Sequence, residues 1–320
     1  MSKHSTTPDQ FRRVTIVGAG TIGYSWAGLF LAHGLDVTIS DPDPDVKAKV
    51  EQALADLTPA LAALGLPTEQ LTSRLRFVAD LEDAVADADV VQENGPERLE
   101  LKQQIWGVIE DSAPDHALFA TSTSTIPATE IATVLRQPER LLVGHPFNPP
   151  HLVPLVEIAP GEKTSAETIE LARAFYTSVG KRPQVLRKEV PGFVANRLQS
   201  ALFREAIHLV SEGVVTEQEL DEVVTSSIGM RWAVAGPFRT FHLGGGAGGL
   251  PAFLEHLGKA LEAQWRVLGT PSLDEPTTAV LRDQAEREFG PLSDIPALEA
   301  RRDQAQIALM KALAELPATD

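Results

Sequence analysis

The sequence contains no cysteine. Disulfide bonds, thiolate metal sites and cysteine nucleophiles are therefore excluded, and we expect no metal centre. Long hydrophobic runs are also absent, because no uninterrupted apolar stretch approaches the roughly 20 residues of a membrane-spanning helix. The first ten residues, MSKHSTTPDQ, lack the hydrophobic region of a secretory signal. We therefore expect a cytoplasmic protein with no membrane partner.

Positive charge is scarce in this chain. Lysine and arginine together number 28 against 44 aspartates and glutamates, which gives the 320 residues a net charge of −16. A nucleic-acid partner would require clustered positive charge, and no Lys- or Arg-rich run is present, so we expect no nucleic-acid binding. The 43% hydrophobic and 22% charged residues are typical of a globular protein with one large or two ordinary domains.

Short Val/Ile/Leu-rich runs alternate with helical patterns over the first two-thirds of the chain. Such alternation is typical of a parallel sheet whose strands are joined by helical crossovers. Runs without polar alternation indicate strands that are buried on both faces. The expected strands are 13–17, 36–40, 74–79, 89–92, 118–122 and 141–145, with a further pair at 155–158 and 184–187; one expected helix between them is 99–112.

The pattern changes near residue 190, beyond which no convincing strand is present. A flexible loop is expected in the glycine run 244–249. We therefore predict an α/β domain over 11–188 and an all-helical domain over 189–316. The helices expected in the second domain are 193–212, 217–226, 251–268, 277–289 and 297–316.

A glycine-rich turn follows the first expected strand and opens a helix. In a dinucleotide-binding turn, the first glycine makes the tight turn, the second lets the backbone approach a pyrophosphate, and the third lets helix and strand pack closely. Free N–H groups at the positive end of the helix dipole then bind the pyrophosphate. The pattern alone is a weak signal, but its place between strand and helix predicts a dinucleotide site. Its residues are Gly18, Ala19, Gly20, Thr21, Ile22 and Gly23.

Asp41 ends the second expected strand, at the position where an acid accepts hydrogen bonds from both hydroxyls of the adenosine ribose. A carboxylate there would repel a 2′-phosphate, and no arginine immediately follows to bind one. These features favour NAD over NADP. The alternative is that Asp41 is a turn residue of the DPDPD run.

Four polar residues stand where an active site would need them. Ser124 and His145 each lie at or just after the end of an expected strand, where open α/β sheets bind ligands. Glu157 lies inside an apolar strand pattern, where a carboxylate needs a partner, and a histidine would suit it. Asn196 lies near the start of a long helix. Each also has a structural alternative (core histidine, edge-strand glutamate, helix cap), but together they favour an active site.

Several motifs occur in a fixed order along the chain: GAGTIG, the strand-ending Asp41, PERLELK, STST, HPFNP, LVE and PGFVANRL. With them the chain resembles the L-3-hydroxyacyl-CoA dehydrogenase family, from about residue 13 to residue 250. The resemblance implies an N-terminal Rossmann domain with a parallel-rich sheet. It also implies NAD as the cofactor and an all-helical C-terminal domain that forms a homodimer.

The resemblance also implies a role for each site residue. His145 would be the general acid/base and Glu157 its partner. Ser124 and Asn196 would bind the reacting substrate oxygen and help to hold the nicotinamide end of the cofactor. Glu97 and Lys102, which both lie in PERLELK, would contact the ribose and nicotinamide side of the cofactor.

Two further runs, SIGMRWA at 227–233 and GPFRTFH at 236–242, resemble one branch of the family more closely. That branch includes L-gulonate 3-dehydrogenase (λ-crystallin), L-carnitine dehydrogenase and ketoreductases of aromatic-polyketide pathways. Its members act on free 3-hydroxy acids, whereas acyl-CoA enzymes of the family usually lack the arginine of GMRWA. Arg231 would then bind the substrate carboxylate bidentately. The alternative for Arg231 is a structural salt bridge or a helix cap.

These observations predict an NAD-dependent oxidoreductase that interconverts an L-3-hydroxy acid and its 3-oxo acid. A free acid is favoured: gulonate-like, carnitine-like or polyketide-derived. The alternative within the same chemistry is a 3-hydroxyacyl-CoA thioester. The alternatives of another class are an inactive structural protein like λ-crystallin and an NAD(H)-sensing protein. The presence of His145 and Glu157 argues against both.

Overall fold

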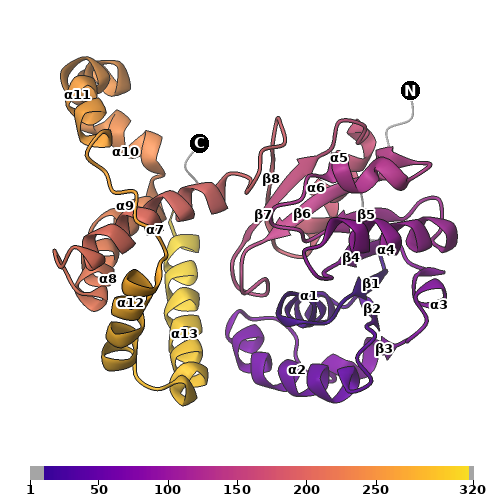
Figure 1. Ribbon diagram of the computed structural model, residues 1–320. Helices are drawn as coiled ribbons and strands as arrows, with labels where there is room; N and C mark the ends of the chain where they lie inside the picture. The colour runs from indigo at the N-terminus through magenta and orange to yellow at the C-terminus, as the bar shows by residue number, and fades with distance from the viewer. Residues whose placement is uncertain (1–10, 317–320) are drawn as a thin grey trace. The chain divides into compact units, whose positions relative to one another are not determined.

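A computed structural model describes residues 11–316 (Figure 1). The chain divides into two compact units. The first runs to Asn196 and also takes in Asp303–Ile307, and the second contains Arg197–Arg302 and the residues from Ala308 onward. Within residues 11–316, no helix has both the length and the apolar character needed to cross a membrane.

The first unit is built on one eight-stranded sheet with the order β3-β2-β1-β4-β5-β6-β7-β8. Neighbouring strands run parallel except for β6 and β7, which pair antiparallel. This confirms the predicted parallel-rich Rossmann sheet. The strands are β1 Arg13–Val17, β2 Asp36–Ser40, β3 Leu75–Phe77, β4 Val90–Glu93, β5 Leu118–Thr121, β6 Leu141–Pro146, β7 Leu155–Pro160 and β8 Arg182–Val185.

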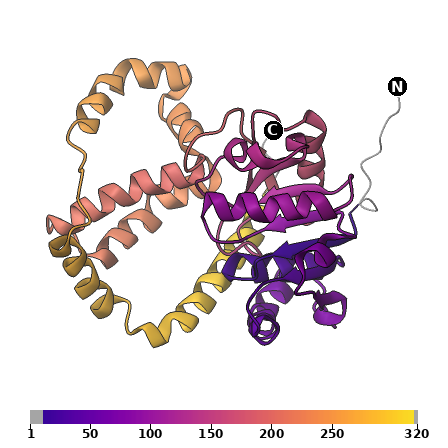
Figure 2. The same cartoon turned by 45° about the vertical axis from the view of Figure 1, so that its right-hand side comes forward.

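Helices cover both faces of this sheet, as Figures 1 and 2 show. One core joins Trp26 and Phe175 to Ile16 and Ile39 of the strands, and the other joins Trp106 to neighbouring strand residues. Successive strand residues point to opposite faces, so strands with a core on each side must be apolar throughout. The helices of this unit are α1 Thr21–Ala32, α2 Val46–Ala63, α3 Leu81–Val85, α4 Leu99–Ser112, α5 Ala128–Ile131 and α6 Ala166–Ser178.

Strand order reverses beside β1, whose two neighbours are β2 and β4. In open α/β sheets this switch point opens a crevice at the carboxyl ends of the strands, where ligands bind. The antiparallel β6–β7 pair places His145 directly opposite Glu157. The sheet therefore positions both the crevice and the predicted acid–base pair.

Beyond residue 192 the described chain contains helices and no strand, which confirms the predicted helical C-terminal region. Two helices were not expected, α9 Ile228–Val234 and α10 Pro237–Gly244. The glycine run predicted as a flexible loop instead contains a 3-10 turn, Gly246–Gly248, directly before α11. The remaining helices are α7 Ala195–Ser211, α8 Glu217–Ser226, α11 Gly249–Trp265, α12 Glu275–Glu288 and α13 Ile295–Ala314.

Candidate active site

The glycine-rich turn has the geometry of a dinucleotide-binding turn. Gly18 has φ +86°, and a Cβ there would lie 3.0 Å from the backbone of Asn94 and Gly95. A Cβ on Gly23 would lie 2.0 Å from the Gly18 carbonyl oxygen, so this glycine lets α1 pack against the turn. A Cβ on Gly20 would meet nothing within 4 Å, which leaves the backbone there open to a ligand.

The first turn of α1 offers unused hydrogen-bond donors. The helix begins at Thr21, and the N-cap residue Gly20 provides no side-chain cap. The first N–H groups of a helix have no partner within the helix and lie at the positive end of its dipole. A pyrophosphate fits these donors, so the turn and α1 are suited to hold a dinucleotide.

Asp41 lies beside the same turn. One carboxylate oxygen accepts the backbone N–H of Ala19 at 2.7 Å, and the other accepts that of Asp43 at 2.9 Å. Each oxygen keeps a further acceptor site, so the carboxylate can still accept hydroxyl groups of a ribose. The residue is therefore both part of the turn and a candidate ribose ligand.

His145 and Glu157 form a buried pair across β6 and β7. The imidazole Nδ1 lies 2.9 Å from Glu157 Oε2, and the two side chains are 4% and 2% exposed. The other oxygen, Glu157 Oε1, accepts the backbone N–H groups of Val194 and Ala195, each at 2.9 Å. A buried carboxylate is costly unless it is bonded in this way.

The pKa of Glu157 reflects these contacts. Burial alone would raise it, but the hydrogen bond with His145 and the backbone N–H groups of Ala195 and Val194 lower it below its ordinary value. Glu157 is thus held as an anion against the imidazole. An anion in that place orients the ring and stabilises its protonated form.

Ser124 completes a line of hydrogen bonds. Its hydroxyl lies 3.1 Å from His145 Nε2, the ring nitrogen that faces away from Glu157. Ser124 is half-buried and lies in the loop after β5. The loop after β5 carries the serine hydroxyl, and the antiparallel pair β6–β7 carries Nε2 of His145. Because the two groups lie side by side, a reacting oxygen could bind both.

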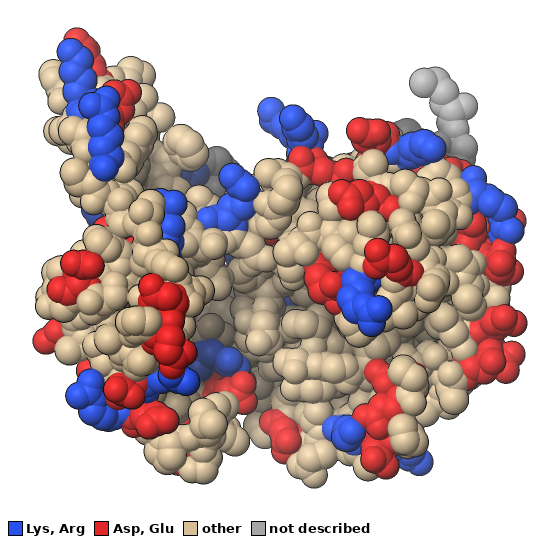
Figure 3. All heavy atoms as spheres, in the orientation of Figure 1, with Lys and Arg blue, Asp and Glu red and all other residues tan. Residues whose placement is uncertain are grey.

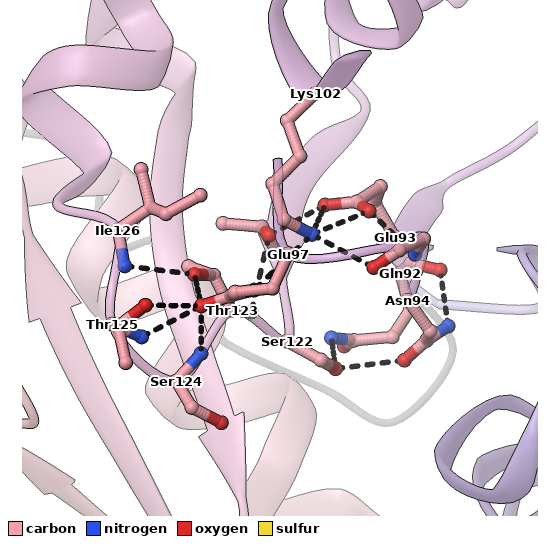
Figure 4. Close-up of polar contacts among 12 residues, drawn as sticks. Gln92, Glu93, Asn94, Glu97, Lys102, Ser122, Thr123, Ser124, Thr125 and Ile126 are labelled. Atoms are coloured by element: carbon pink, nitrogen blue, oxygen red, sulfur yellow. Dashed lines mark hydrogen bonds and ion pairs between the residues drawn. The ribbon is translucent and has the colours of Figure 1, made fainter. Parts of the chain in front are cut away.

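Glu97 organises the loop that carries Ser124 (Figure 4). Its Oε1 accepts the hydroxyls of Thr123 and Thr125, at 2.6 and 2.8 Å, and the backbone N–H groups of Ser124 and Thr125, at 3.0 and 2.8 Å. Burial favours the neutral form of Glu97, but the threonine bonds and the charge of Lys102 lower its pKa below the ordinary value. Glu97 therefore holds the serine loop as an anion.

Lys102 is paired with Glu93, a residue that the sequence did not single out. Its ammonium group lies 2.8 and 3.0 Å from the two carboxylate oxygens of Glu93, and 3.9 Å from Glu97 Oε2. Both Lys102 and Glu93 are buried, and Glu93 also accepts the hydroxyl of Thr121 at 2.6 Å. A carboxylate at the end of an apolar strand signals a buried partner, and that signal, used for Glu157, was available for Glu93 too.

The two remaining predicted residues lie in different units. Asn196 is the second residue of α7 and the last residue of the first unit, next to Ala195 with its hydrogen bond to Glu157. Arg231 lies on α9 in the second unit with an exposed side chain. It forms no ion pair with any described residue.

A second network was not foreseen from the sequence. Ser122 donates to Asn94 at 2.7 Å and accepts from Gln92 at 2.9 Å, and Tyr176 donates to Gln92 at 2.7 Å. The bonds among Gln92, Asn94 and Ser122 join the ends of β4 and β5 (Figure 4), and Tyr176 extends the network to α6. Polar residues are common at strand ends, so no pattern in the sequence pairs these side chains.

Family models match most of the chain, and known proteins match nearly all of it. Residues 13–190 match the NAD binding domain of 3-hydroxyacyl-CoA dehydrogenase, and residues 192–271 match the C-terminal domain of the same family. The L-carnitine dehydrogenase of Streptomyces coelicolor is 43% identical over 312 residues, which cover 97% of this chain and 98% of that protein. The L-carnitine dehydrogenase of Pseudomonas aeruginosa is 41% identical over 309 residues, which cover 97% and 96%.

Solved structures agree with these matches. An NAD+-dependent dismutase, 5-formyl-3-hydroxy-2-methylpyridine 4-carboxylic acid 5-dehydrogenase, has a TM-score of 0.81 at 32% identity, covering 96% of this chain and 100% of that one. The (S)-3-hydroxybutyryl-CoA dehydrogenase of Ralstonia eutropha has a TM-score of 0.62 at 27% identity, covering 88% and 96%. The glycine turn, the sheet and both family models thus lead to one conclusion. The chain belongs to the 3-hydroxyacyl-CoA dehydrogenase family and is an NAD-dependent oxidoreductase that acts on CH–OH groups.

Proposed function

We propose that the chain interconverts an L-3-hydroxy acid and its 3-oxo acid, with His145 as the general acid/base. The observation that carries this proposal is the hydrogen-bonded line from Ser124 through His145 to Glu157, with distances of 3.1 and 2.9 Å. Such a line leaves one imidazole nitrogen directed at the substrate and fixes the other against an anion. General acid/base groups are placed in this manner.

The proposed reaction separates a hydride from a proton. NAD held at the glycine-rich turn would supply the hydride acceptor for oxidation at C3, and its reduced form would supply the hydride donor for reduction. During oxidation, neutral His145 takes the proton of the C3 hydroxyl on Nε2, and Glu157 stabilises the resulting imidazolium. Ser124 and Asn196 hold the C3 oxygen by hydrogen bonds that are already in place when charge develops on it. In reduction, protonated His145 returns the proton to the same oxygen.

The cofactor contacts are proposed from the turn and the loop. We assign the pyrophosphate to the backbone of Gly18, Gly20, Thr21, Ile22 and Gly23, and the adenosine ribose to Asp41. We propose that Glu97 and Lys102 face the ribose and nicotinamide side of the cofactor. Glu97 would do so through Oε2, because the hydrogen bonds that hold the serine loop all go to Oε1. Lys102 is 1% exposed, so it reaches the cofactor only if its ammonium group leaves Glu93.

A free acid is the proposed substrate, with L-carnitine as the first compound to test. The support is that relatives 41–43% identical over 97% of this chain are L-carnitine dehydrogenases. We propose that Arg231 binds the substrate carboxylate, which its exposed guanidinium is suited to do. Gulonate-like and polyketide-derived acids remain in the same proposed class.

The experiment is an assay of NADH formation with L-carnitine, L-gulonate, 3-hydroxybutyrate and 3-hydroxybutyryl-CoA. The proposal expects kcat/KM to be highest for one of the free acids. A thioester is the second candidate, because a 3-hydroxybutyryl-CoA dehydrogenase shares the fold at 27% identity. Faster turnover of the thioester than of every free acid would establish that candidate and contradict the role proposed for Arg231.

Assembly, domain limits and location are also proposals. We propose a homodimer formed through residues 189–316, with the NAD-binding domain over 11–188, in the cytoplasm. Large apolar side chains exposed on the second unit support the dimer, among them Phe238, Leu243 and Trp265. Light scattering that finds a monomer at micromolar concentration would overturn it. Limited proteolysis should cut near 188, and cell fractionation tests the location.

A further inference from the structure

Phe193 has a backbone conformation that the proposed reaction does not explain. Its φ is +47°, in the left-handed region that bulky residues rarely adopt. Among the residues that the structure describes, Gln70 is the other non-glycine residue with positive φ. A residue persists in such a conformation only when its surroundings determine it strongly, and such residues cluster at functional sites.

Packing around the ring holds Phe193 in place. The side chain is 1% exposed and packs in a small core with Ala128, Val143 and Ala159. Its ring centroid lies 5.3 Å from that of His145, at an interplanar angle of 46°. The ring thus packs beside the imidazole and limits how far the imidazole can tilt.

The backbone of Phe193 turns the chain toward Glu157. Its N–H donates to the carbonyl of Val190 at 2.9 Å, and Gly192 before it has φ +75°. The next two N–H groups, of Val194 and Ala195, then both donate to Glu157 Oε1 at 2.9 Å. One residue therefore contacts the imidazole with its ring and delivers the donors of the carboxylate with its backbone.

We propose that Phe193 is a positioning residue that fixes the geometry of the His145–Glu157 pair, an inference that rests on the acid/base role proposed above. The left-handed turn aims two backbone donors at Glu157 Oε1, which leaves Oε2 for His145. The ring packs beside the imidazole and keeps it in line with that oxygen. Together they set how strongly the imidazole binds its proton.

The competing explanation is that Phe193 only fills the core. A core role predicts loss of thermal stability without any change at His145. The variant Phe193→Leu separates the two explanations, because leucine keeps a buried apolar side chain but lacks the ring face. Phe175→Leu is the matched control, since Phe175 is also fully buried, on α6, where its ring contacts those of Phe11, Phe30 and Tyr176.

The measurement is an NMR titration of His145 in cofactor-free protein labelled with ¹⁵N-histidine, with His145→Gln to assign its signal among the eight histidines. In Phe193→Leu the imidazole should bind its proton less tightly, because it tilts away from Glu157. The titration midpoint should fall by about 0.5–1 pH unit. The kcat of the holoenzyme should fall about 10- to 100-fold, as for other small misplacements of a catalytic group.

Ala195→Pro tests the backbone half of the proposal. Ala195 is the first residue of α7, where proline is well tolerated, and proline removes one donor from Glu157. The carboxylate should then attract the imidazole proton more strongly, so the titration midpoint should rise. The two variants are therefore expected to shift the same midpoint in opposite directions.

Each outcome decides between the explanations. Equal losses of Tm in Phe193→Leu and Phe175→Leu with an unmoved His145 midpoint would overturn the positioning role. An unmoved midpoint in Ala195→Pro would overturn the part assigned to the backbone donors. Failure of the proposed function is a separate result: wild-type protein would then turn over neither free acids nor thioesters, whatever the titrations show.

Discussion

The two compact units differ in how deeply their tryptophans are buried. In the first unit, Trp26 and Trp106 are fully buried, at 0% exposed. In the second unit, Trp232 and Trp265 are 39% and 63% exposed. A sheet with helices on both faces gives the first unit two closed cores, whereas the helices of the second leave a large apolar surface uncovered.

This difference separates two kinds of chemistry. The groups proposed to move protons lie in the first unit, where buried strands and hydrogen bonds fix them. Arg231, proposed to select the substrate, lies on an exposed helix of the second unit. On the face of the first unit drawn in Figure 3, acidic side chains are prominent and basic ones lie among them. Substitutions in the first unit should affect all substrates, and those in the second only some.

The largest effect is expected at His145. His145→Gln should lower kcat by about 10²–10⁴-fold for every substrate, because the proton of the C3 hydroxyl loses its acceptor. Steady-state assays of NADH formation measure this. His116→Gln is the control, since His116 also pairs with a carboxylate, Asp89 at 3.1 Å, but on an exposed side chain. Near-native turnover in folded His145→Gln would contradict the assignment.

A selective effect is expected at Arg231. Arg231→Met should weaken transition-state binding of free acids by about 2–5 kcal/mol, because the substrate carboxylate loses its partner. Turnover of a thioester or ester, which carries no charge at C1, should be spared. The exposed Arg266 on the same unit supplies the control variant Arg266→Met. Equal losses on charged and uncharged substrates would show that Arg231 is structural.

Cofactor choice is expected to depend on Asp41. Asp41→Ser should lower the preference for NADH over NADPH by about 10- to 100-fold, since a bond to a charged group contributes about 1.5–3 kcal/mol. The ratio of kcat/KM for the two cofactors measures the preference. Asp45→Ser, four residues further on, should leave it unchanged. A wild type that uses both cofactors equally would remove the basis of this prediction.

An effect on stability rather than on activity is expected at Lys181, which lies buried beside Trp26 and donates to the carbonyls of Pro150 and Val153. Burial lowers the pKa of Lys181 to about 7. Between pH 7 and the ordinary lysine pKa of 10.5, the unfolded state therefore binds more protons than the folded state. The unfolding free energy should rise with pH in that window by up to about 1.4 kcal/mol per unit.

The measurement compares wild type with Lys181→Met by urea unfolding at several pH values. All these proteins carry Phe in place of Trp232 and Trp265, so that the tryptophan fluorescence reports the unfolding of the first unit alone. Lys181→Met should lack the rise, and Lys163→Met, at an exposed position, should keep it. Identical slopes in all three proteins would show that Lys181 keeps its ordinary proton affinity in the folded state.

Much of the first unit could be predicted because its signals are local. Strands β1 and β2 and helix α4 have the bounds expected from apolar patterning. Ser124, His145 and Glu157 do come together, because the carboxyl ends of neighbouring strands share an edge. Helices α9 and α10 were missed because both are short and rich in glycine or aromatic residues, so their apolar positions show no clear period.

The contacts that escaped prediction depend on three-dimensional neighbours. Nothing in the sequence pairs Lys102 with Glu93 rather than with Glu97, because all three lie within ten residues and only the turn after β4 decides. The left-handed Phe193 was equally hidden, because phenylalanine carries no local signal for positive φ. The conformations of such residues depend on packing against residues that are distant in the sequence, and a local sequence pattern does not contain that information.

The antiparallel ladder between β6 and β7 has a consequence for how this protein can vary. Side chains alternate between the two faces along a strand, so a shift of one residue in either strand would turn His145 and Glu157 to opposite faces. Deletion of a single residue inside β7 should therefore abolish the pair even though both residues remain in the sequence. Relatives with other substrates can vary their exposed helices freely. In β6 and β7, however, insertions or deletions must come in even numbers, so that His145 and Glu157 stay on the same face.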